Sequence, residues 1–308
     1  MPISMTLRQD LTDYAFGLLP DFQHLLDLAD LFAPRVPTGT TTGRYTIFNS
    51  AQAFLAYDAD RGLGGTAQRI KFGADVGTFD ATPKALEVGI DDEERNRAGE
   101  AGFPLLERAK TRTLVSNACV SHLNKVMTVV SAGVAAVANR GVWSDPNTDP
   151  LAELDEQMEA ILNATGILPN NIAMDFGPWR KLRNHPKVRS RMPGAARAVP
   201  SMDDIAAMLT APNVKMTLAT ARKATAGFKN TDDSKTAILG SNAYLFYSSP
   251  AADQYDPSFC KAFSVRPEQL TAVRTYRDET VRSDILALDW SNDIEVVSAS
   301  LARRLAIT

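Results

Sequence analysis

The 308-residue chain carries 33 Lys plus Arg against 36 Asp plus Glu, which gives a formal net charge of −3. Proteins dedicated to nucleic-acid binding usually contain a basic domain, so this weakly acidic balance argues against that class. The two cysteines are too few for a disulfide framework and indicate a reducing compartment.

The sequence also lacks the patterns of membrane and secreted proteins. It has no basic start followed by an apolar core, as a secretory signal would have. It has no apolar run of about 18 residues, the length that spans a bilayer. We therefore expect synthesis and folding in the cytoplasm, with no membrane partner. The length allows one to three domains, and a hydrophobic content of 44% allows a large core.

The first 43 residues are predicted to form an N-terminal arm. They contain one amphipathic stretch, which breaks at Pro34 and Pro37 and is followed by a Gly/Thr tract. An isolated helix of this length is not stable in water, so we expect it to lie on its own domain or on a neighbour. Its apolar positions are Phe22, Leu25, Leu26, Leu28, Ala29 and Phe32.

Residues 44–95 differ from the arm in being rich in glycine and poor in core-forming side chains. β-Favouring fragments such as "RIKF" and "LEVGI" alternate with glycines at 62, 64, 65, 73, 77 and 89. This pattern predicts strands that flank a long, poorly packed loop. Such a loop is unusual inside a compact domain. An extended hairpin that packs on another subunit would account for it.

A long helix is predicted from about residue 104 to residue 132. Pro104 can begin a helix and Gly133 can end one. The helix would be roughly 40 Å long at 1.5 Å per residue, well above the usual length of a globular helix. Its apolar side carries Leu106, Leu114, Ala118, Val126 and Val129.

The second half of the chain mixes short helices and strands. "PLAELDEQMEAILNATG" predicts a helix that ends at Gly166, with an apolar face of Leu151, Leu154, Met158, Ile161 and Leu162. "LPNNIAMDF" predicts a strand, followed by a helix from about Gly177 that Pro186 terminates.

A further helix, "SMDDIAAMLT", is predicted to have Ser201 as its N-cap. The strands "NVKMTLATA" and "SNAYLFYSS" flank a polar loop, and the tail is predicted to form three more strands. Because helices and strands do not alternate regularly, the predicted fold class is α+β.

A basic run from Arg180 to Arg191 is the strongest local charge feature, with six Lys or Arg and no Asp or Glu. Trp179 is expected to anchor a short helix here. The arginines then pair with carboxylates of the same or an adjacent chain; direct contact with nucleic acid is the alternative. The candidate residues facing a neighbouring subunit or DNA are Arg180, Lys181, Arg183, Lys187, Arg189 and Arg191.

Signatures of catalysis are sparse. In "CVSH", Cys119 and His122 lie three residues apart on the long helix, a spacing that a thiolate–imidazole pair or a metal site can use. No further ligand follows, so a buried structural thiol is favoured. "GLGGTAQRI" lacks the Lys-Ser/Thr ending of a P-loop. The acidic stretch 91–96 fits a helix start better than a cation site. We therefore predict no catalytic, cofactor or metal site.

The order of these features resembles a block in the major capsid proteins of tailed bacteriophages. It runs from "ILPNNIAMDFGPWRKLRNHPKVRSRM" through "SMDDIAAMLTAPNVKMTLATARKAT" to "ILGSNAYLFYSSP". A Leu-x-x-His-Pro motif is present as Leu182, His185 and Pro186. Upstream, "RYTIF", "GGTAQRI" and "LEVGIDDEERNRAG" are also similar to that family. The resemblance covers roughly residues 20–305.

The resemblance implies the Hong Kong 97-type shell fold. Its expected parts are an N-terminal arm (1–43), an extended loop (44–95), a peripheral domain with the spine helix (96–144), an axial domain (145–262) and C-terminal strands of the peripheral domain (263–308).

The implied function is a non-enzymatic major capsid protein located in the virion. Its hexamers and pentamers would form an icosahedral head shell around phage double-stranded DNA, assembled in the cytoplasm of a bacterial host. The implied partners are further copies, a separate scaffolding protein, a portal, a possible decoration protein and non-specifically contacted DNA. An encapsulin-like nanocompartment or a gene-transfer particle is the alternative with the same fold, and a cytosolic thiol enzyme is a third hypothesis.

Overall fold

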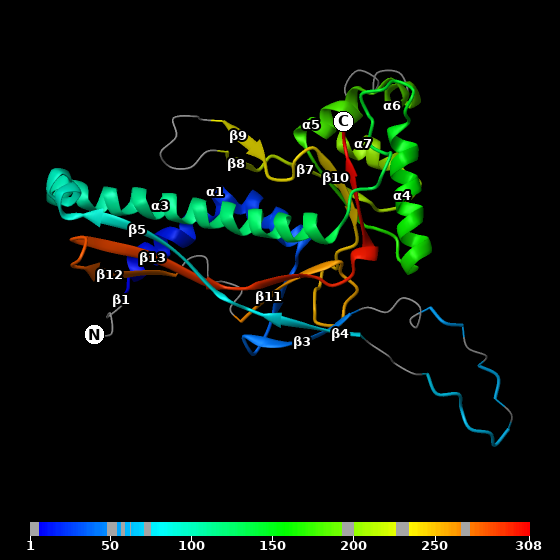
Figure 1. The fold of residues 1–308 in the computed structure, drawn as a ribbon, viewed down its shortest axis with the longest axis horizontal. Coiled ribbons are helices and arrows are strands. Elements are labelled where there is room, and N and C mark those ends of the chain that lie inside the picture. The colour runs from blue at the N-terminus through cyan, green and yellow to red at the C-terminus, as the bar shows by residue number, and fades with distance from the viewer. Residues whose placement is uncertain are drawn as a thin grey trace.

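The computed structural model describes residues 6–47, 54–56, 59–61, 63–70, 75–192, 200–225, 234–265 and 272–308. Figure 1 shows an elongated molecule, in which two long helices lie beside a sheet and a second group of short helices and strands stands at one end. Helices and strands are mixed without regular alternation, which confirms the predicted α+β class.

Helix α1 (Gln9–Phe32) confirms the predicted amphipathic stretch and ends before Pro34. It runs beside the long helix α3 (Asp92–Gly133), and its buried residues belong to the main hydrophobic core. At its end, Phe32 is fully buried and stacks on Phe246 at 4.7 Å between ring centroids. The buried face of α1 therefore lies on its own chain, the first of the two surfaces expected for this helix.

Helix α3 begins earlier than predicted, at Asp92 instead of near residue 104. The side chain of Asp91 caps it by accepting from the backbone N–H of Glu93 at 2.8 Å. Gly99, with φ 68° and ψ 174°, interrupts the helical geometry, and the second segment continues past Pro104 to Gly133. The acidic first turn suits the positive end of the helix dipole, so the short first segment is stabilised. The predicted end at Gly133 is confirmed.

The main sheet lies along α1 and α3. Its order is β1 (Thr6–Leu7), β12 (Val273–Asp278), β13 (Ser283–Ser291) and β5 (Pro83–Asp91), and all its neighbours are antiparallel. The predicted fragment "LEVGI" lies in β5. Residues 83–95 thus belong to the sheet and the start of α3, so the predicted loop of 44–95 is shorter than expected.

A hairpin leaves this body next to the sheet. Strands β3 (Thr42–Ile47) and β4 (Asp75–Asp80) pair antiparallel and flank the loop, as predicted. At the hairpin's base, Tyr45 and Phe79 stack on Phe263 at 5.1 and 4.6 Å. Phe263 lies in β11 (Cys260–Ser264), which joins β14 (Asp293–Val296) and β2 (Arg35–Pro37) in a three-stranded sheet. Residues 63–70 extend away from the rest of the molecule (Figure 1), whereas Phe54, earlier in the loop, lies beside Gly166.

The second unit is built on the sheet β15 (Ala302–Ala306), β10 (Asn242–Phe246), β6 (Asn171–Asp175) and β7 (Lys215–Ala219). Its helices α4 (Pro150–Thr165), α5 (Phe176–Asn184), α6 (Pro186–Arg191) and α7 (Met202–Ala207) share a second core with one face of this sheet. The other face joins the main core through Ala173, Tyr244 and Phe246. One small hairpin, β8 (Arg222–Ala224) with β9 (Lys235–Ala237), completes the described strands of this region.

The C-terminal tail differs from prediction in two respects. It forms four strands instead of three, with the short 3-10 helix Ala299–Leu301 before the last one. This last strand, β15, pairs with β10 in the second unit and does not return to the main sheet. Its Leu305 is fully buried against Ala243 and Leu245, so burial in the second core selects this pairing.

Candidate functional site

The basic run lies on two consecutive short helices of the second unit. Asp175 caps α5 and accepts from the N–H of Gly177 at 3.4 Å. His185 caps α6: its Nδ1 accepts from the N–H of Lys187 at 3.3 Å, and its Nε2 donates to the carbonyl oxygen of Asp145 at 3.1 Å. Pro186 ends α5 as predicted, but it also begins α6, since proline fits the first helical position.

The six candidate basic residues fall into two groups. Lys187 donates to the carbonyl oxygen of Asn147, and Arg191 pairs with Asp149 at 2.5 Å. These contacts hold α6 against the turn that precedes α4. Arg189, also on α6, is exposed. The predicted pairing with carboxylates of the same chain therefore occurs at the α6 end of the run.

Arg180, Lys181 and Arg183 form the second group, on α5. Helix α5 is anchored by Trp179 and Leu182, which are 7% and 0% exposed, as the sequence predicts for Trp179. Within the described part of the chain, none of the three cations has a hydrogen bond or ion pair. Their predicted role at a neighbouring subunit or DNA stays a prediction, and the structure leaves them free to play it.

An ion pair at the start of α5 fixes the direction of this helix. Both guanidinium nitrogens of Arg222 contact the carboxylate of Asp175, at 2.5 and 3.3 Å. Asp175 is only 6% exposed. Because a partly buried bidentate pair tolerates little displacement, it ties the β6–α5 junction to β8. The sequence showed no sign of this contact, since 47 residues separate the partners.

Cys119 and His122 are both buried on α3, as the structural interpretation predicts. Burial raises the pKa of the Cys119 thiol to about 11, whereas an activated thiolate needs a lowered pKa. His122 Nδ1 instead lies 3.1 Å from the side-chain nitrogen of Asn292, which donates to it. Asn292 also accepts from the ammonium of Lys84. Cys119 and His122 therefore lie in the environment of packed core residues.

Acidification is expected to destabilise the protein through His122. Burial lowers the pKa of its imidazole from 6.5 to about 4, with the charges of Arg35 and Lys84 adding to the effect. Between these values the unfolded chain binds a proton that the folded chain does not. The free energy of unfolding should thus fall by up to about 3 kcal/mol as pH drops through this window. Urea unfolding of the wild type and of His122→Gln from pH 7 to 4 tests this, and parallel curves for the two would contradict it.

The acidic stretch 91–96 is the start of a helix, as predicted. Asp92 forms two 2.7 Å hydrogen bonds with Arg277, Glu94 pairs with Lys110 at 3.0 Å, and Arg95 pairs with Asp284 at 3.1 Å. In the ranges that the structure describes, no group of three His, Cys, Asp or Glu side chains is placed to hold a metal ion. Over the same ranges, no helix combines the length and hydropathy needed to cross a membrane.

Glycine-rich residues 63–70 form neither helix nor strand, while Gly62 lies outside the described residues. The described loop carries four large apolar side chains in water. The exposed fractions are 58% for Phe54, 55% for Leu55, 107% for Leu63 and 71% for Ile70. Large apolar side chains exposed within one segment favour a surface that binds another molecule.

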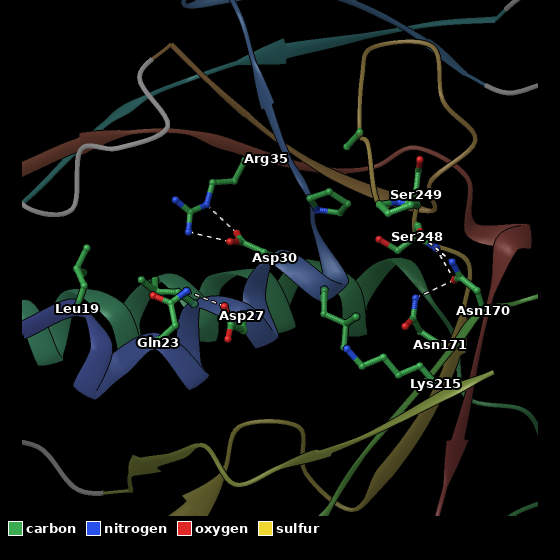
Figure 2. Close-up of a pocket in the computed structure, with 15 residues that line it drawn as sticks. Leu19, Gln23, Asp27, Asp30, Arg35, Asn170, Asn171, Lys215, Ser248 and Ser249 are labelled. Atoms are coloured by element: carbon green, nitrogen blue, oxygen red, sulfur yellow. Dashed lines mark hydrogen bonds and ion pairs between the residues drawn. The ribbon is translucent and has the colours of Figure 1, made fainter. Parts of the chain in front are cut away.

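A pocket of about 760 Å³ lies between α1 and the second unit (Figure 2). Its polar side chains satisfy one another: Arg35 donates twice to Asp30, at 2.7 and 2.9 Å, and Asn170 exchanges hydrogen bonds with the backbone of Ser248 at 2.7 and 3.0 Å. Burial raises the pKa of Asp30, and Arg35 opposes this. Sequence reasoning missed the pocket because its walls lie far apart along the chain.

Comparison with known proteins relates the chain to others through its fold. No protein-family model and no curated protein matches the sequence. Among solved structures, a phage-related protein from Bordetella bronchiseptica RB50 is similar, with a TM-score of 0.69 and 18% identity, over 98% of this chain and 97% of that one.

Two assembled particles are also similar. The capsid of cyanophage P-SCSP1u has a TM-score of 0.55 and 10% identity, over 91% of this chain and 87% of that one. An encapsulin complex from Synechococcus elongatus PCC 7942 has a TM-score of 0.50 and 11% identity, over 91% and 86%. Identities this low establish architecture only. The chain has the Hong Kong 97-type fold of phage capsid proteins.

Proposed function

We propose that this protein is a major capsid protein whose copies assemble, as hexamers and pentamers, into the icosahedral head shell around phage double-stranded DNA. The shell fold supports this, and the exposed loop is the observation that carries it. Leu63 and Ile70 extend from the hairpin β3–β4 with most of their surface in water. An apolar extension of this kind becomes stable when it packs on another copy of the chain.

The parts of the molecule take the roles that the fold suggests. We propose that the main sheet with α3 forms the peripheral domain and that the second unit, largely within residues 145–262, forms the axial domain near capsomer centres. Strand β15 adds to this axial unit. The loop reaches the neighbouring subunit. Residues 1–43 act less as a free arm than as part of the peripheral core, because α1 is buried against α3.

The proposal places the protein in the virion, assembled in the host cytoplasm with a separate scaffolding protein and a portal, and with a possible decoration protein. Packaged DNA would be contacted without sequence preference, because a shell must enclose any genomic sequence. The role is structural and not enzymatic. The raised pKa of the buried Cys119 thiol disfavours the alternative of a thiol enzyme.

A nanocompartment shell is the second candidate, and the similarity to the encapsulin favours it. A gene-transfer particle would contain DNA, as a phage capsid would. Particles purified from cells that naturally carry the gene should contain nuclease-protected double-stranded DNA, measured by gel electrophoresis after protein digestion. Particles without nucleic acid that contain a single co-purifying protein would instead establish the nanocompartment.

A further inference from the structure

Helix α5 carries a stripe of one aromatic and two basic residues, of which Phe176 and Arg180 are exposed and Arg183 is partly buried. Phe176, Arg180 and Arg183 are spaced by four and three positions, so they share a face of the helix. Phe176 is 53% exposed, whereas Trp179 and Leu182, which flank the stripe and belong to the second core, are buried. Arg180 and Arg183 have no hydrogen-bond or ion-pair partner within the described chain. This stripe thus combines an apolar group with two free positive charges.

Helix α4 presents the complementary stripe. Asp155, Glu159 and Leu162 are also spaced by four and three positions, and they line a groove of about 530 Å³. Leu162, predicted to lie on the buried face, is 36% exposed, and the adjoining Leu168 is 38% exposed. Unlike Asp155, which accepts from Thr210, Glu159 has no hydrogen-bond or ion-pair partner in the described ranges. The groove is therefore apolar at one end and acidic along its length.

The two stripes match when the helices run antiparallel. At 1.5 Å per residue, each stripe is about 10.5 Å long. Placing Phe176 against Leu162 brings Arg180 opposite Glu159, offset by about 1.5 Å, and Arg183 opposite Asp155. We propose that α5 of one copy docks in the α4 groove of the next copy in a ring of subunits. This inference rests on the proposed function, because it assigns the surfaces that join neighbours around a capsomer.

The position of the two helices supports contact between copies. Helix α5 packs on β6 and β7, whereas α4 contacts β10 and β15, so the two helices cover different strands of one sheet face (Figure 1). A chain therefore does not seat its own α5 in its own groove. Two different complementary patches on one subunit make a head-to-tail interface, which closes into a ring when the rotation between subunits permits.

Charge favours a second copy over DNA as the occupant of the α5 stripe. Phosphate groups would bind the cations, but they would make no favourable contact with the exposed apolar ring of Phe176 beside them. The acidic groove supplies partners for both the cations and the ring. The chain as a whole is acidic, with a net charge of −3. Interfaces between copies gain specificity from matched charges of this kind.

A reciprocal charge reversal tests the proposal. One full-length variant carries Arg180→Glu and Arg183→Glu, and the other carries Asp155→Arg and Glu159→Arg. Each variant alone brings like charges together and should reduce the assembled fraction at least tenfold, measured by analytical ultracentrifugation. Mixing them should restore assembly, with the two chains alternating in equal amounts. Circular dichroism should show that both remain folded, and Arg180→Gln with Arg183→Gln should give an intermediate loss.

The control carries Arg97→Glu and Lys125→Glu, an equal change of charge on exposed positions of α3. Wild-type behaviour of each variant alone, no recovery in the mixture, or an equal defect in the control would overturn the proposal. Normal shells of the α5 variant with weakened binding of DNA would assign the stripe to nucleic acid and also overturn it. Failure of the wild type itself to assemble would instead refute the proposed function.

Discussion

Replacing Leu63 and Ile70 with serine is expected to abolish shell assembly and leave the chain folded. Both side chains lie in the loop and have most of their surface in water. Burying an aliphatic side chain contributes about 2 kcal/mol, so losing two weakens each contact between copies roughly a thousandfold. Because every subunit repeats the contact, the loss acts throughout the shell.

Light scattering measures the assembly of this variant, and thermal unfolding measures its stability. A matched control replaces Tyr255 and Val281, which are 70% and 55% exposed but lie outside the loop, with serine. The control should assemble as the wild type does. Shells of normal mass from the loop variant would show that the loop does not hold neighbours together.

Phe32→Ala is expected to cost about 3–5 kcal/mol of the free energy of unfolding. The ring is fully buried, stacks on Phe246 at 4.7 Å and meets Tyr244 edge-on at 5.4 Å. Removing it leaves a cavity where α1 meets the second unit. This loss follows if α1 is part of the subunit's own core; it would be absent if residues 1–43 were a detachable arm.

Urea unfolding measures the effect, and the same helix supplies the control. Phe16 is 66% exposed on α1, so Phe16→Ala should change the free energy of unfolding by less than about 0.5 kcal/mol. If Phe32→Ala lowers the free energy of unfolding by less than about 1 kcal/mol, α1 is not part of the subunit's own core and acts as an arm that packs on another copy.

Elements with strong local signals could be predicted from the sequence. The end of α4 at Gly166 follows from its left-handed backbone, φ 74°, which glycine adopts without strain. Ser201 caps α7 through a reciprocal pair of hydrogen bonds with Asp204, as its hydroxyl and the following acidic turn indicate. Periodicity likewise located the buried side of α1, because apolar residues recur at helical spacing.

Contacts between distant segments could not be predicted in this way. The alternation of residues 302–306 indicates a strand but does not say that its partner is β10. The early start of α3 depends on the cap of Asp91 and on Arg277, which lies 185 residues from Asp92. Leu162 fits the periodicity of α4, yet it is 36% exposed, because none of the described elements covers that part of the helix.

For the candidate basic residues, too, local features could be predicted from the sequence and long-range contacts could not. Their charge and Trp179 were evident in the sequence, but their separation into a paired α6 group and an unpaired α5 group depends on where the turn at 145–149 lies. The acidic groove on α4 was not predicted at all. Its residues come from two segments, 152–168 and 210–212, that only the fold brings together.

The mass of the purified wild-type protein, expressed alone and measured by ultracentrifugation with electron microscopy of the same sample, tests the central claim most directly. Closed hollow particles with many times the 33.4 kDa mass of one chain are expected. A folded single chain of 33.4 kDa that persists at high concentration, with the loop at 54–70 protected from proteolysis, would contradict the claim.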